Sequence, residues 1–232
     1  MANSASKRWR AVLVATHVLT SVGWMAMALA QTTLVAHGIG AAAPTRSAAY
    51  AMAEYLDVML LQHLAVAAAY TGMMLSLLTP WGIFRFWWVS VKFVLTLGGL
   101  YLGIAHLGGW LHQALSAAAV GTSGSGPAFR VMAGGIAMIV VLAFMAWVSA
   151  AKPWGRTRAA GRATGPAPHA AWFAMTMAVP FLDTAAVLAG VLPGPLLSIV
   201  SLIGYAAYRR ARSAPPGIQP ANPGTSAQPA RR

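Results

Sequence analysis

The stretch of sequence that decides the fold is residues 131–150, which read VMAGGIAMIVVLAFMAWVSA and contain no charged side chain. An α-helix needs about 20 apolar residues to cross the ~30 Å hydrocarbon layer of a membrane. Three further stretches have this length and almost no charge: Ala11 to Val35, Leu56 to Leu78 and Trp87 to Leu111. The sequence therefore predicts an all-α fold, a polytopic transmembrane bundle with four core helices in residues 11–150.

The composition of the whole chain agrees with a membrane protein. Of its 232 residues, 58% are hydrophobic and only 8% are charged, whereas soluble domains are about a quarter charged. Lys and Arg outnumber Asp and Glu by 16 to 3, but most of the basic residues flank apolar spans. We therefore expect the lipid bilayer and its anionic headgroups as partners, and no nucleic acid. The absence of cysteine excludes disulfides and thiolate metal sites.

The distribution of basic residues predicts the orientation, because an excess of Lys and Arg marks the cytoplasmic side. One side of the spans carries Lys7, Arg8, Arg10, Arg85, Lys92, Lys152, Arg156, Arg158 and Arg162. The other side carries only Arg46 and Arg130. We expect a multi-pass protein of a bacterial cytoplasmic membrane, with its basic N-terminus, residues 1–10, and a basic linker, residues 151–169, inside. The first span also resembles a cleavable signal peptide, although it continues to Val35 and contains His17.

The apolar region 170–208 is too long for one crossing and barely long enough for two. Leu192-Pro193-Gly194-Pro195 supplies a turn near its middle. We expect a C-terminal helical hairpin or a re-entrant pair, which returns the basic residues after Tyr208 to the cytoplasmic side. Whether the chain crosses five or six times is left open. Residues 213–232 are rich in Pro, Gly, Ser, Gln and Ala, so the tail is predicted to be disordered.

Polar residues in two spans recur at helical spacing. In the third span they form a stripe that should face the bundle: Lys92, Thr96, Gly99, Gly103, His106 and Trp110. In the first span, His17, Ser21, Trp24 and Gln31 share a face. Such stripes are typical of close helix packing, while ionisable residues within a membrane also indicate function.

Two groups of histidine and acidic residues suggest ligand sites. His63 and His106 each lie ~10 Å from the outer boundary and could face each other, which makes them candidate ligands of haem b or copper. A second candidate is a divalent-cation site near the outer surface: His37, Glu54, Asp57 and His112. Alternatively, Glu54 and Asp57 lie at the start of the second helix, where carboxylates offset the helix dipole.

No motif for catalysis is found. The sequence contains no Gly-rich phosphate loop, no paired catalytic carboxylates and no nucleophile beside a base, so no catalytic residue is predicted. The favoured interpretation is a non-enzymatic membrane bundle or accessory subunit, with partner membrane subunits or a homo-oligomer as its assembly. The alternatives are a haem- or copper-handling protein and a small-solute transporter, in which Asp183 beside Pro180 marks a broken helix.

A segment around the end of the second span carries a family resemblance. It includes Thr71-Gly72, Leu78-Thr79-Pro80-Trp81-Gly82, Arg85, Trp88-Val89, Lys92 and Leu95-Thr96. It resembles a family of uncharacterised four-helix integral membrane proteins from actinobacteria, over roughly residues 12–158, which implies a fold and a location but no activity. His17 followed by Trp24 is distantly similar to copper-resistance membrane domains and to the membrane-bound protoporphyrinogen oxidase family. The region after His169 departs from the four-helix pattern.

Overall fold

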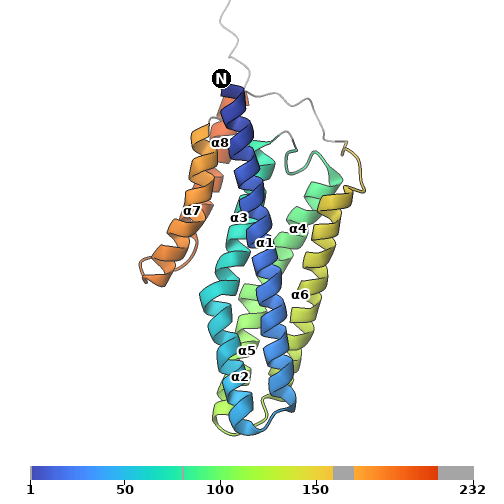
Figure 1. Ribbon diagram of the computed structural model, residues 1–232, viewed down its shortest axis with the longest axis vertical. Helices are drawn as coiled ribbons and strands as arrows, with labels where there is room; N and C mark the ends of the chain where they lie inside the picture. The colour runs from blue at the N-terminus through green and yellow to red at the C-terminus, as the bar shows by residue number, and fades with distance from the viewer. Residues whose placement is uncertain (1, 80, 159–169, 214–232) are drawn as a thin grey trace, which may run out of the picture.

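The computed structural model describes residues 2–79, 81–158 and 170–213 (Figure 1). The first helix, α1 (Ala2–Gly40), runs along the long axis of the molecule. The predicted linker from residue 159 and the predicted tail from residue 214 lie outside the described residues.

The second span is one long helix with a π-helical turn inside it. It consists of α2 (Ala43–Leu56), η1 (Asp57–Leu61) and α3 (Gln62–Leu78). Only residues 41 and 42 separate α1 from α2, so most of residues 37–55 is helical. Gly38 does not end α1 early but makes room for the ring of Tyr50, which a Cβ would meet. Pro44 lies in the first turn of α2, where a missing N–H is tolerated.

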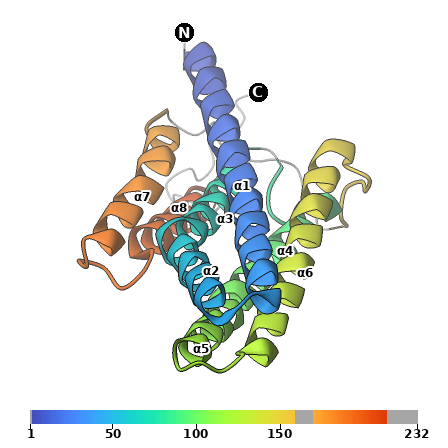
Figure 2. The same ribbon diagram turned by 60° about the horizontal axis from the view of Figure 1, so that its bottom comes forward.

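The third span is built in the same way. It consists of α4 (Trp87–Leu102), the π-helical turn η2 (Gly103–Leu107) and α5 (Gly108–Ala119), and it is followed by α6 (Ser125–Ala151). Helix α6 packs along α1, and α4 and α5 pack against α6 (Figures 1 and 2). Within the described residues, five helical stretches are long and apolar enough to cross a membrane: 7–40, 43–78, 87–119, 125–151 and 171–188. The predicted all-α bundle is confirmed.

The predicted C-terminal hairpin is also confirmed. It is formed by α7 (Ala170–Leu188) and α8 (Leu196–Ser213). In Figure 1, α7 descends only partway along the bundle and α8 returns to the end where the N-terminus lies. The Tyr70 and Ser201 hydroxyls hydrogen-bond at 2.7 Å, and Arg209 Nη1 donates to the Leu77 carbonyl at 2.7 Å. These contacts fasten α8 to α3.

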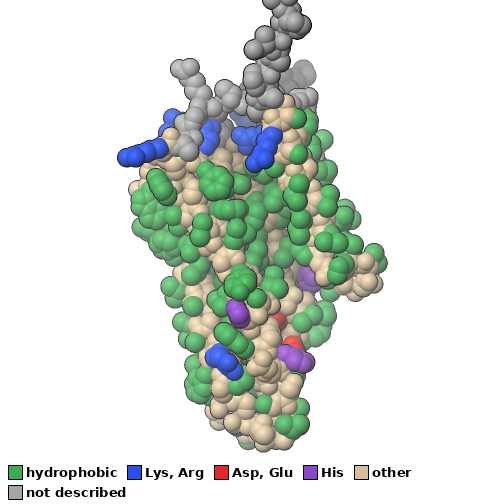
Figure 3. All heavy atoms as spheres, turned by 180° about the vertical axis from the view of Figure 1, so that it is seen from behind, with side chains coloured by type: hydrophobic (Ala, Val, Ile, Leu, Met, Phe, Trp, Pro, Cys, Tyr) green, Lys and Arg blue, Asp and Glu red, His purple; other side chains and the backbone are tan. Residues whose placement is uncertain are grey.

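Two loops pair at the same end of the molecule. They follow the Pro-Trp-Gly segments at the ends of α3 and α6, and residues Phe86 and Arg156 form an antiparallel bridge between them. The Thr157 N–H donates to the Arg85 carbonyl at 3.0 Å, and Lys152 Nζ lies 5.8 Å from the centre of the Trp81 ring. Lys and Arg side chains gather here in Figure 3. We call this the basic end and the opposite one the far end.

The exterior of the helices is apolar. Leu19, Val140 and Phe181 are between 61% and 71% exposed, and hydrophobic side chains cover much of the face in Figure 3. A soluble protein rarely exposes apolar surface of this extent. The fold therefore fits an integral membrane protein.

Candidate functional sites in the bundle interior

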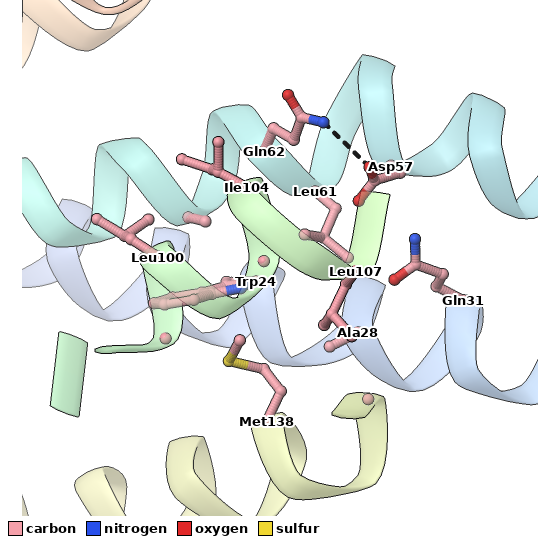
Figure 4. A pocket seen from close by; sticks show the side chains of 14 residues that line it. Trp24, Ala28, Gln31, Asp57, Leu61, Gln62, Leu100, Ile104, Leu107 and Met138 are labelled. Carbon is pink, nitrogen blue, oxygen red and sulfur yellow. Dashed lines mark hydrogen bonds between the residues drawn. The ribbon is translucent and has the colours of Figure 1, made fainter. Parts of the chain in front are cut away.

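The bundle contains two cavities at different depths. The basic-end cavity measures about 250 Å³ and lies between α1, α3, α4, the loop before α4 and the last turn of α6. The far-end cavity measures about 30 Å³ and lies between α1, η1, α3, α4, η2 and α6 (Figure 4). Each is lined by at least one ionisable side chain from a predicted membrane span, Lys92 in the first cavity and Asp57 in the second.

His17 forms one wall of the basic-end cavity. Its Nδ1 lies 3.0 Å from the Ala68 carbonyl oxygen and 3.2 Å from Thr71 Oγ1. Because a carbonyl only accepts, the hydrogen bond to Ala68 requires a proton on Nδ1. In the neutral ring, Nε2 is then free to accept a hydrogen bond. Gly72 makes this position possible, because a Cβ there would lie 2.8 Å from His17 Cε1.

Two lysines line this cavity, the exposed Lys152 after the end of α6 and the half-buried Lys92 on α4. The ammonium group of Lys92 reaches from α4 to α6, where it donates to Ser149 Oγ. Ser149 Oγ donates in turn to the Met145 carbonyl at 3.0 Å. No Asp or Glu is found among the described residues that line the cavity. A ligand's acidic group would therefore meet no repelling carboxylate beside Lys92.

The remaining wall of the basic-end cavity is apolar and aromatic. Trp81 and Trp88 meet edge to face with ring centres 5.6 Å apart, and Phe93 and Leu75 line the same space. Val18 is 51% exposed and belongs to the lining, so the cavity reaches the apolar outer surface beside α1. This combination of lysine side chains and an apolar wall suits a ligand that has both an acidic group and an apolar part.

Asp57 is the ionisable residue of the far-end cavity. It is only 7% exposed, and Gln62 Nε2 donates to its Oδ2 at 3.0 Å. Gln31 is 5% exposed, and its Nε2 has no hydrogen-bond partner within the described residues. Figure 4 shows the amide nitrogen of Gln31 turned towards the carboxylate of Asp57. Two amide groups thus surround one buried carboxyl group.

The π-helical turns explain this placement. Asp57 is the first residue of η1, and η2 supplies Gly103, Ile104 and Leu107 to the same cavity. An inserted residue turns the following side chains by about 100° around the helix axis. The dipole interpretation of Asp57 is wrong, because its helix begins at Ala43 and Asp57 lies well inside it.

An apolar layer separates the two cavities. Trp24 is 3% exposed and lies midway along α1 between His17 and Gln31, roughly 10 Å from each. A Cβ on Gly99 would lie 3.3 Å from Met138 Sδ and 3.5 Å from the Trp24 ring. The packing interpretation of Gly99 is thus supported, while Gly103 has no such neighbour and lines the far-end cavity.

The predicted haem or copper ligands occupy other positions. His106 stacks on Trp110 with ring centres 5.5 Å apart and meets Tyr101 edge to face at 5.3 Å. His63 is half-buried on α3, and neither histidine is among the residues that line the two cavities. No hydrogen bond or ring contact joins them in the described part of the chain. The haem or copper site stays a prediction.

The predicted divalent-cation site is only partly brought together. His112 Nδ1 and Glu54 Oε1 form an ion pair at 2.8 Å, with side chains 72% and 29% exposed. His37 is exposed at the end of α1, and Asp57 points into the far-end cavity. Residues 2–79, 81–158 and 170–213 contain no group of three or more His, Asp or Glu that could hold a metal ion.

Asp183, which the transporter hypothesis placed in a broken helix, is hydrogen-bonded to the backbone of α8. It is 2% exposed, and its two carboxylate oxygens accept the backbone N–H groups of Leu197 at 2.9 Å and Ser198 at 2.7 Å. These are orphan donors in the first turn of α8. Asp183 therefore caps α8 and closes the hairpin.

Comparison with known proteins finds no family model, no curated protein and no solved structure that matches the chain. The function is therefore inferred from the two cavities alone.

Proposed function

We propose that the chain is a non-enzymatic membrane protein that binds a single-chain anionic amphiphile in the basic-end cavity. The observation that carries this proposal is the position of Lys92, whose ammonium group lies inside an otherwise largely apolar cavity with no acidic neighbour in its lining. The ligand class is a hydrocarbon chain with a carboxylate or phosphate head.

The electrostatics of Lys92 favour an anionic head group. Charged groups inside a membrane are unfavourable unless they are paired or hydrogen-bonded. An ammonium group has three N–H donors, of which Ser149 accepts one. A carboxylate or phosphate would satisfy the remaining donors and supply the missing negative charge.

The shape of the cavity favours one slim chain. Its volume of about 250 Å³ is slightly below the ~300–1,000 Å³ that is typical of pockets for drug-sized ligands. Trp88, Phe93 and Leu75 supply an apolar wall, and the exposed Val18 marks its opening to the lipid-facing surface. A hydrocarbon chain could enter there while its head group reaches Lys92.

The charge distribution supports placing this cavity in the cytoplasmic half of a bacterial membrane. Lys7, Arg8, Lys152 and Arg156 lie at the N-terminal end or in the paired loops, which is the arrangement expected on the cytoplasmic side. The amphiphile would then come from the inner leaflet.

Native mass spectrometry of the delipidated protein in detergent tests the proposal. Oleate and oleoyl lysophosphatidic acid supply the two head groups, and oleyl alcohol is the neutral control. We expect one equivalent of either anion to bind, at least about tenfold more tightly than the alcohol. That factor corresponds to ~1.4 kcal/mol.

The variant Lys92→Met should lose this preference, whereas Lys7→Met, which changes an exposed lysine outside the cavity, should keep it. Equal binding of the alcohol and the anions, or unchanged binding in Lys92→Met, would contradict the proposal.

A further inference from the structure

The far-end cavity holds a buried acid without a charged partner. Among the described residues, Asp57 has no ion pair; Gln62 Nε2 donates to its Oδ2, and the amide of Gln31 approaches the same carboxyl group. A carboxyl group at this depth must be neutral, paired or in contact with water, because an isolated charge is strongly disfavoured. The far-end cavity offers the third possibility.

A single water molecule fits this cavity. Its volume of about 30 Å³ exceeds the ~10–15 Å³ that one water requires, and a buried water also needs polar partners. Gln31 supplies the donor that lacks a partner, and Asp57 Oδ1 is the carboxylate oxygen that Gln62 leaves free. Such a water would accept from Gln31 Nε2 and donate to Asp57.

We propose that Asp57 reversibly binds a proton inside the membrane, with water in the far-end cavity as the proton donor and acceptor. On uptake, an O–H bond of a hydronium ion breaks and an O–H bond forms on the carboxylate, which leaves a neutral acid and a water. On release, the same steps run backwards. The site is separate from the basic-end cavity and does not depend on the proposed ligand.

The amide groups beside Asp57 can hydrogen-bond to both its charged and its neutral form. Gln62 donates to the carboxylate as it stands, and Gln31 presents a second N–H. Rotation of either amide by 180° would present its oxygen, which accepts from the O–H of the neutral acid. The π-helical turns η1 and η2 flank the site, and such turns are frequent at functional sites.

The neighbouring charges leave Asp57 as the group that titrates in this cavity. Glu54, one turn earlier on the same helix, is paired with His112. The other elements around the cavity contribute no charged side chain from the described residues: α1 gives Trp24, Ala28 and Gln31, α4 and η2 give Gly99, Leu100, Gly103, Ile104 and Leu107, and α6 gives Gly135 and Met138.

Labelling with a hydrophobic carbodiimide tests the proposal, because this reagent reacts with protonated carboxylic acids in apolar surroundings. Peptide mass spectrometry of the full-length protein in detergent should locate the label on Asp57. The labelling rate should fall as the pH rises, by about tenfold per pH unit once the acid form becomes the minority. Asp57→Asn should abolish the label, and Glu54→Gln should retain it.

Three results would overturn the proposal. Labelling that does not change with pH means a permanently neutral acid. Protection by Na⁺ at constant pH means a metal-ion site instead of a proton site. The third result concerns infrared spectroscopy, in which the protein should show a carboxylic C=O band that titrates with pH and is absent in Asp57→Asn. The absence of such a band would overturn the proposal. This measurement does not depend on whether the carbodiimide reaches the cavity. None of these results affects the Lys92 experiment.

Discussion

The imidazole of His17 occupies the space that a side chain on Gly72 would fill. A Cβ at Gly72 would lie 2.8 Å from His17 Cε1 and 3.3 Å from Nδ1, the atom that bonds to the Ala68 carbonyl. This contact joins α1 to α3 beside the basic-end cavity.

Gly72→Ala should therefore destabilise the bundle by displacing the ring and breaking its hydrogen bond. Overpacking of this kind costs about 1–3 kcal/mol, and we expect a lower midpoint of thermal unfolding in detergent. Gly98→Ala is the matched control, because no atom lies within 4 Å of its added Cβ and alanine favours a helix. Equal midpoints for the two variants would show that His17 does not pack as described.

Asp183→Ala should release the start of α8. The two backbone N–H groups at Leu197 and Ser198 would lose their acceptor, and removal of a helix cap costs about 0.5–2 kcal/mol. Hydrogen exchange at residues 196–200 should accelerate while exchange in α6 stays unchanged. Asp183→Asn, which keeps one acceptor oxygen, should give an intermediate rate; no acceleration in either variant would refute the capping role.

The paired loops can be tested by a disulfide, because the chain has no cysteine of its own. Phe86 and Arg156 form an antiparallel bridge, in which Cα atoms lie about 4.5–5.5 Å apart, within the range that a disulfide spans. Phe86→Cys with Arg156→Cys should form an intramolecular disulfide on mild oxidation. Phe86→Cys with Arg46→Cys, which joins the basic and far ends, should not. If Phe86→Cys with Arg156→Cys formed no disulfide, the two loops would not be paired as described.

Reporter fusions test the orientation. Alkaline phosphatase is active only outside the cytoplasm, so fusion after Ser213 should give low activity and fusion in the loop between α5 and α6, after Thr122, should give high activity. This follows from the excess of Lys and Arg at the basic end and from the hairpin, which returns α8 to that end. High activity after Ser213 would exclude a cytoplasmic C-terminus.

The sequence predicts the spans well because length and absence of charge are sufficient to identify them. Helix α3 ends at Leu78 and α4 begins at Trp87, as predicted. The polar stripe predicted in the third span faces the bundle at its N-terminal end. There Lys92 donates to Ser149, and Thr96 Oγ1 lies 3.6 Å from Met145 Sδ.

The sequence could not reveal the details that build the far-end cavity. A period of 3.6 residues assumes an uninterrupted α-helix, but η2 breaks that period between Gly99 and His106. Gly38 packs closely against Tyr50, a contact that the sequence of α1 alone does not indicate. Gln31 was visible as a polar residue of the first span, but its approach to Asp57 depends on how α1 packs against η1, which no local pattern encodes.

The most direct test of the proposed function is photocrosslinking with an oleate analogue that carries a diazirine near its carboxylate, followed by peptide mapping. Binding beside Lys92 predicts crosslinks in residues 88–96 of α4 and 14–18 of α1, which excess oleate removes and Lys92→Met prevents. Crosslinks spread over exposed lipid-facing residues such as Phe129 and Val140, unaffected by oleate or by Lys92→Met, would contradict the proposal.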